Sequence, residues 1–292
     1  MKSKRTVHLV AIAVLLLGLL TPSLHAHDHL AAGALTSDPG ANLFFVNDAD
    51  FGAESGNVLP MDAGDDGTPY AGYYYTSDVA FVVLAATPNY GGPETYHPGL
   101  GAHIQVQLES VEGPRGAHFG FWETPGNEID STNLTWTVPT GLTGGTNLIF
   151  LSENDGSAGA DPYGHIHGRV YSVDLPGLYK VGFQFIDTST NGPGGGPVNS
   201  PSTVYYLYFQ AGVTIGRTSL SDDGIDLLFA APSNIPDSGI GDATVYTLES
   251  SATLDSTAQW EPVGDSVIGD DHVHNISVPF STNNRFFRLS TQ

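Results

Sequence analysis

Residues 169–185 read Arg-Val-Tyr-Ser-Val-Asp-Leu-Pro-Gly-Leu-Tyr-Lys-Val-Gly-Phe-Gln-Phe, two runs of β-branched and aromatic residues separated by a Pro-Gly pair. Runs of this composition, bounded by turn residues, predict β-strands. We expect strands at 169–173 and 177–187, with Pro176 and Gly177 forming the turn of a hairpin between them. Similar runs recur along the chain, and no segment after residue 26 keeps a 3.6-residue apolar period. The sequence therefore predicts an all-β protein.

The spacing of the expected strands predicts two β-sandwich domains. The first covers residues 27–212 and has long loops, where binding residues usually collect. The second covers residues 213–292, where about six short strands indicate a small sandwich of the fibronectin type III kind.

Residues 1–26 have the pattern of a secretory signal peptide. Lys2, Lys4 and Arg5 precede an apolar run at 7–20, and a small residue, Ala26, stands at the expected cleavage point. The apolar run is too short for a transmembrane helix. We therefore expect the mature chain to be secreted, periplasmic or displayed on the surface of a bacterium, with no transmembrane span.

The composition indicates which partners the protein can have. The chain carries 31 acidic and 9 basic residues, a formal net charge of −22, and no cysteine. A field of this sign repels phosphate backbones and anionic lipids, so we expect cations as partners and exclude nucleic acid. Without cysteine, disulfides and thiolate chemistry are excluded, and a metal site must use His, Asp or Glu.

A pair of histidines stands in the segment Asp161-Pro-Tyr-Gly-His165-Ile-His167-Gly-Arg169. In a strand, residues two apart project from the same face with Cα atoms roughly 6.5–7 Å apart. Two imidazoles in this arrangement can bind one metal ion, and imidazole suits zinc, copper and nickel. The alternative interpretation is two hydrophilic side chains on the wet face of an edge strand.

Three other histidines are candidates to complete such a site. Cleavage after Ala26 would make His27 the N-terminus and give His27-Asp28-His29 with a free α-amine. These two residues either join the first pair or remain a disordered tip, the usual state of termini. His118 lies on an alternating strand, where it either reaches the site or packs against Trp122.

Four motifs carry a family resemblance. They are His27-Asp-His-Leu-Ala-Ala-Gly-Ala-Leu35, Val111-Glu-Gly-Pro-Arg-Gly-Ala-His118-Phe-Gly-Phe-Trp122, Gly164-His165-Ile-His167 and Leu175-Pro-Gly-Leu-Tyr-Lys-Val-Gly-Phe183. Over residues 27–212 the chain resembles bacterial surface proteins of the choice-of-anchor M type and related exported proteins of zinc-limitation regulons. The resemblance implies an exported β-sandwich associated with zinc handling, without an established reaction. Residues 213–292 look like the C-terminal β-modules of exported bacterial proteins.

The leading hypothesis is therefore a non-enzymatic exported protein that sequesters zinc or delivers it to a metal transporter or a cell-surface component. His165 and His167 are the expected core ligands, and His27, His29 or His118 would complete the site.

Two alternatives come from other classes of protein. The first is a histidine-brace copper oxidase, in which the amine and ring of an N-terminal His27 bind copper. The second is a structural or adhesive surface module, in which exposed aromatic residues such as Tyr73, Tyr74 and Tyr75 make the contacts.

Overall fold

The structure is a computed structural model that describes residues 28–36, 38–46, 51–86, 96–123, 133–166, 169–233, 244–281 and 285–292. These residues are almost entirely β-strands arranged in several sheets, which confirms the all-β prediction. Two short 3-10 helices, Ala53–Ser55 and Pro193–Gly195, interrupt the loops. Within these ranges no helix is long and apolar enough to cross a membrane. The expected signal peptide lies outside the described residues.

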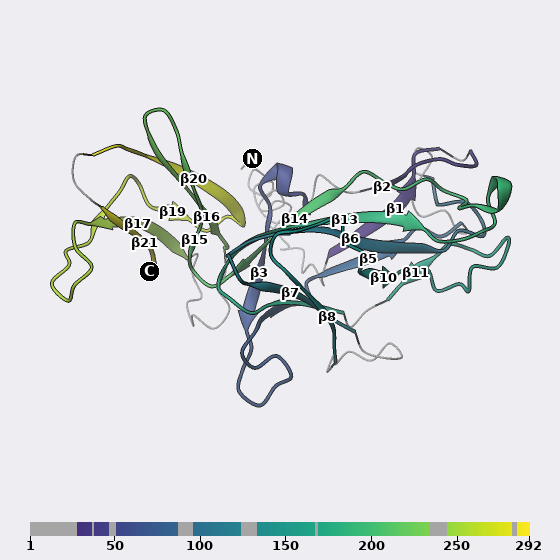
Figure 1. Ribbon diagram of the computed structural model, residues 1–292, viewed down its shortest axis with the longest axis horizontal. Coiled ribbons are helices and arrows are strands. Elements are labelled where there is room, and N and C mark those ends of the chain that lie inside the picture. Colours follow the sequence, from purple (N-terminus) through teal and green to yellow (C-terminus); the bar gives the residue numbers. More distant parts are fainter. Residues whose placement is uncertain are drawn as a thin grey trace, which may run out of the picture.

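Residues 58–211 contain a large sheet of ten strands. Its strands run in the order β10-β6-β13-β14-β3-β4-β12-β7-β8, with β9 pairing β6. Figure 1 labels β3, β6, β7, β8, β10, β13 and β14 of this sheet. The strands are β3 (Val58–Ala63), β4 (Tyr74–Thr76), β6 (Ile104–Glu112), β7 (His118–Trp122), β8 (Leu134–Pro139), β9 (Leu142–Thr143), β10 (Leu148–Phe150), β12 (Val170–Val173), β13 (Gly177–Asp187) and β14 (Tyr205–Ala211).

A small sheet of four strands packs against the large one. Its order is β11-β5-β1-β2, made by β11 (Gly164–His165), β5 (Val79–Val83), β1 (Asp28–Ala34) and β2 (Leu43–Phe45). The strands β1 and β5 are parallel, and the other two pairings are antiparallel. Because β1 lies between β5 and β2, the start of the described chain is an interior strand of this sheet.

Aromatic side chains fill the space between the two sheets. Phe81 of β5 is 2% exposed, and its ring centroid lies 5.3 Å from that of Phe183 and 6.0 Å from that of Phe185. Phe45 of β2 stacks on Phe185 at 3.9 Å. Buried side chains from both sheets thus meet in a single apolar core, which makes this part of the chain a sandwich.

The expected hairpin at Pro176 and Gly177 is wrong. Strand β12 pairs with β4 and β7, whereas β13 pairs with β6 and β14, so the two strands lie apart in the same sheet. Gly177 has φ +156°, an extended conformation that glycine adopts easily, instead of the value near +80° that a tight Pro-Gly turn requires. The Pro-Gly pair therefore forms a corner at which the chain crosses the sheet.

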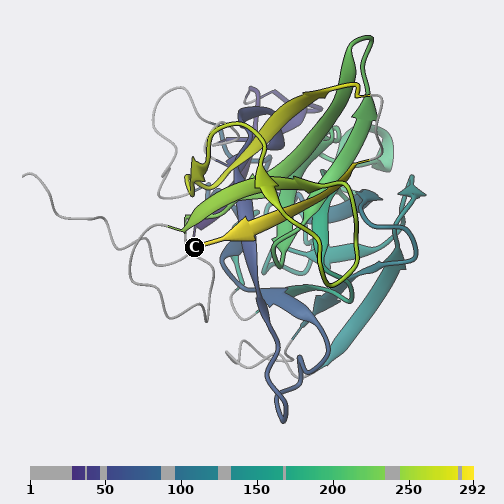
Figure 2. The same ribbon diagram turned by 90° about the vertical axis from the view of Figure 1, so that its left-hand side faces the viewer.

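Strands β15–β21 form a second, smaller sandwich (Figure 2). One sheet has the order β15-β16-β20, and in the other β17 pairs with β18, β19 and β21. Leu227, Leu248 and Val278 pack together between the two sheets. The strands are β15 (Ile215–Leu220), β16 (Gly224–Ala231), β17 (Val245–Ser251), β18 (Glu261–Pro262), β19 (Val267–Ile268), β20 (His272–Pro279) and β21 (Phe286–Thr291).

The two sandwiches touch along β3 and the start of β20. The amide of Val58 donates to the carbonyl of Asp271 at 2.8 Å, and that of Val273 donates to Gly56 at 2.9 Å. Beside these hydrogen bonds, Val58 and Leu178 of the first sandwich pack against Ala230 of the second. The connection between the sandwiches is the short segment between β14 and β15.

Candidate metal centre

His29 and His165 are placed on one face of the small sheet by the pairing of three strands. In register, His29 of β1 lies opposite Ala80 of β5, and His165 of β11 lies opposite Val82. Since Ala80 and Val82 are two residues apart, all four side chains share a face. The intervening residues, such as Phe81, point into the core. The two imidazoles therefore lie on the outer face of the sheet, from strands on either side of β5.

The two rings approach one another through the same nitrogen. The Nε2 atoms are 2.8 Å apart, and the ring centroids are 4.6 Å apart with an interplanar angle of 69°. As a metal-free pair, one neutral ring donates a hydrogen bond to the other. Two nitrogens bound tetrahedrally to one zinc ion lie about 3.3–3.4 Å apart, given Zn–N bonds of about 2.0–2.1 Å. A small rotation of either side chain covers this difference, so the pair fits two positions of a zinc site.

The loop before β11 holds His165 in place. The backbone amide of His165 donates to Oε1 of Glu153 at 2.9 Å. Asp161 ties the same loop to the end of β5, because its Oδ1 accepts hydrogen bonds of 3.0 Å from the amides of Ala86 and Tyr163. The acidic residues around the pair thus fix the backbone on which one imidazole is carried.

The structure places the other predicted ligands as follows. His27 and His167 lie outside the described residues. His118 begins β7 and is held by Asp174, which accepts from its ring Nδ1 and its backbone amide at 2.7 Å each. The structure does not bring His118 to the other two histidines. Over the described ranges, no group of three or more His, Asp or Glu side chains is arranged to hold a metal ion.

His29 lies in a strand that the sequence only weakly indicates. Leu30 and Ala32 are fully buried and alternate with His29 and Ala31, a period of two that was present in the sequence. The signal was weak because alanine and glycine, which make up most of β1, are depleted in strands. The structure thus assigns His29 to an ordered sheet, where the sequence left open a disordered tip.

Tyr74 and Tyr75 lie on opposite faces of β4, and Tyr73 directly precedes the strand. Tyr74 packs against the core, whereas Tyr75 stacks on Tyr70 at 4.3 Å between ring centroids. Tyr73 meets Trp122 edge to face at 5.5 Å. Half-buried aromatic rings therefore form a cluster on the outer face of the large sheet.

The chain matches no protein-family model, no curated protein and no solved structure. The resemblance to the choice-of-anchor M type and to zinc-regulon proteins accordingly stays a prediction from the four motifs.

Proposed function

We propose that the protein is an exported metal-binding protein that takes up zinc through a site built on His29 and His165. The observation that carries the proposal is the 2.8 Å separation of their Nε2 atoms, in residues 136 positions apart. Both histidines stand in short His-x-His motifs. The fold brings one member of each motif together, and convergence of imidazoles from remote segments is typical of metal sites.

The remaining ligands of the proposed site are His27 and His167. Each is the other member of a His-x-His motif that contains His29 or His165, and both lie outside the described residues. Four nitrogen ligands would give a closed tetrahedral site, which suits holding or passing on the ion rather than catalysis. The net charge of −22 favours the capture of cations, and a metal transporter or a cell-surface component would receive the ion.

The test is the zinc affinity of the purified, metal-free chain, measured by competition with a chromophoric chelator. We expect His29→Ala and His165→Ala each to weaken zinc binding at least about 10–100-fold, since even residues that only orient a ligand have effects of this size. His118→Ala is the matched control and should bind as the parent does. A double variant of His29 and His165 that retained the parent's affinity would refute the proposal.

A spectroscopic readout separates the loss of a ligand from a loss of folding. The zinc absorption edge of the loaded parent should show nitrogen ligands alone, and each variant should keep the thermal unfolding midpoint of the metal-free parent. If the variants are already unfolded before zinc is added, their weaker zinc binding would come from loss of the folded sheet and not from loss of a ligand.

The copper-oxidase alternative depends on His27 being the first residue of the mature chain. Mass spectrometry of the exported protein tests this requirement directly. An N-terminus at any other residue removes the alternative, because the brace needs the free amine of His27.

A further inference from the structure

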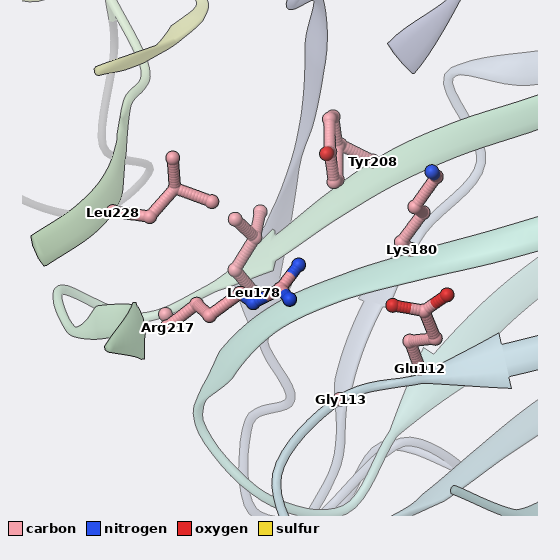
Figure 3. Close-up of a pocket in the computed structure, with 8 residues that line it drawn as sticks. Glu112, Gly113, Leu178, Lys180, Tyr208, Arg217 and Leu228 are labelled. Carbon is pink, nitrogen blue, oxygen red and sulfur yellow. The ribbon is translucent and has the colours of Figure 1, made fainter. Parts of the chain in front are cut away.

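A cavity of about 340 Å3 opens where the two sandwiches meet, away from the small sheet that carries the histidines. It lies between the ends of β6, β13 and β14 on one side and β15 and β16 on the other. Figure 3 shows the side chains of Glu112, Lys180 and Tyr208 rising from neighbouring strands, with Arg217 reaching toward them from β15. The lining residues are Glu112, Gly113, Leu178, Lys180, Tyr208, Gly216, Arg217 and Leu228.

The cavity concentrates positive charge in an acidic protein. The chain has only 9 Lys and Arg residues against 31 Asp and Glu, yet both Lys180 and Arg217 line this one space. In the part of the chain that the structure describes, Arg169 and Arg288 are paired with Glu123 and Glu249, whereas neither Lys180 nor Arg217 is in a salt bridge. The Lys180 ammonium lies 4.3 Å from the ring centroid of Tyr206. Within the described residues no carboxylate neutralises either cation in a salt bridge, so both can attract an anion that enters the cavity.

The other lining groups add a hydrogen-bond acceptor and an apolar wall. Lys180 lies between Glu112 and Tyr208 in the register of β6, β13 and β14. Burial is the main cause of a raised pKa of Tyr208, with Glu112 raising it further and Arg217 opposing the shift. The Tyr208 hydroxyl is thus protonated at neutral pH and can donate, while the Glu112 carboxylate accepts. Leu178 and Leu228 supply apolar contact.

We propose that this cavity binds a small hydroxylated carboxylate, of which a sugar acid is the simplest example. Lys180 and Arg217 bind the carboxylate, and Glu112 accepts a hydrogen bond from a hydroxyl group. The ring of Tyr208 and the side chains of Leu178 and Leu228 contact the carbon skeleton. A volume of about 340 Å3 is at the small end of ligand sites, which suits a single sugar unit or two.

The test uses the full chain, metal-free, titrated with glucuronate, glucose and acetate by isothermal calorimetry. Glucose lacks the charge and acetate lacks the hydroxyl groups, so we expect glucuronate to bind more tightly than either. Lys180→Gln and Arg217→Gln should each weaken glucuronate binding about tenfold, the effect of losing one charge-assisted hydrogen bond. Arg285→Gln removes an exposed cation outside the cavity and should leave the affinity unchanged.

Three outcomes would each overturn the proposal. The first is equal binding of glucose and glucuronate, and the second is no binding of glucuronate at millimolar concentration. The third is an unchanged glucuronate affinity in both Lys180→Gln and Arg217→Gln. Equal thermal unfolding midpoints of parent and variants verify that a loss of binding comes from the cavity and not from the junction between the sandwiches.

Discussion

Phe81 is one of the side chains through which the small sheet contacts the aromatic core of the large one. Its ring lies edge to face or tilted against Tyr171, Phe183 and Phe185, and it is 2% exposed. The same strand carries the residues opposite the two histidines on its other face. Packing on one face of β5 therefore supports the arrangement of the imidazoles on the other.

We expect Phe81→Ala to lower the free energy of unfolding by about 3–5 kcal/mol, because it removes a buried ring and leaves a cavity. Phe81→Leu should cost less, since it keeps most of the volume. Phe280→Ala, at a position 58% exposed, is the control and should change stability by no more than about 0.5 kcal/mol. Urea denaturation measures the free energy of unfolding of all three variants. An equal loss of stability in Phe81→Ala and Phe280→Ala would contradict the placement of Phe81 in the core.

We expect Asp270 to make the stability of the second sandwich sensitive to acid. Partial burial raises its pKa, but hydrogen bonds from the His274 ring at 2.9 Å and the His272 amide at 3.1 Å outweigh this effect and hold the pKa below the ordinary value for an aspartate. A carboxyl whose pKa is lower in the folded state stabilises the fold above its unfolded pKa. That contribution is lost as the pH falls through the folded value.

Asp270→Asn should therefore destabilise the protein near neutral pH and lose less stability than the parent on acidification to about pH 3. Unfolding free energies at several pH values measure this difference. Asp222→Asn, in an exposed turn, is the matched control. Parallel pH profiles for the parent and Asp270→Asn would show that the carboxylate has no such role.

At the scale of elements, β11 is short and closely confined. A Cβ atom built on Gly164 would lie 1.7 Å from the carbonyl oxygen of Leu151, so only glycine allows the strand to approach that segment. The position of His165 beside His29 depends on this close approach.

We expect Gly164→Ala to displace β11, to cost about 1–3 kcal/mol of stability and to weaken zinc binding as strongly as the loss of a histidine does. Gly196→Ala is the control, because the nearest atom to its Cβ is 3.9 Å away and its φ is −95°. Calorimetry and zinc competition on the two variants test the prediction. Unchanged zinc affinity in Gly164→Ala would show that zinc binding does not depend on the position of β11.

Most strands could be predicted from composition and alternation alone. Residues 177–187 and 79–83, for example, are rich in aromatic and β-branched residues, and β13 and β5 begin where the pattern begins. The sequence did not show β3, which contains Pro60, or β1, which is mostly alanine and glycine. Both strands are parallel partners of later ones, and such pairing depends on the packing of the whole sheet rather than on local preference.

The candidate site could be predicted only in part, for the same reason. The sequence shows that His29 and His165 are possible metal ligands. Their contact arises because β5 pairs in parallel with β1 and antiparallel with β11, and local sequence does not indicate these pairings. The cavity with Lys180 and Arg217 left no sequence signal, because its residues come from strands in two different sandwiches.

For the whole molecule, we expect the net charge of −22 to affect the stability of the fold more than any single ion pair does. Repulsion among the carboxylates destabilises the compact state and is screened by salt. We expect the thermal unfolding midpoint to rise between about 0.05 and 0.5 M sodium chloride, while glucuronate binding weakens over the same range. A midpoint that fell with salt would show that favourable ion pairs dominate the electrostatics of the fold.

The parallel pairing of β3 with β14 also has a kinetic consequence. Tyr208 lies opposite Val58, so the large sheet closes only when segments about 150 residues apart have met. Chains dominated by such distant pairings fold slowly, on timescales of milliseconds to seconds or longer. Until residues 205–211 have joined the sheet, the edge of β3 that pairs with β14 stays open, and an open strand edge can pair with another chain instead.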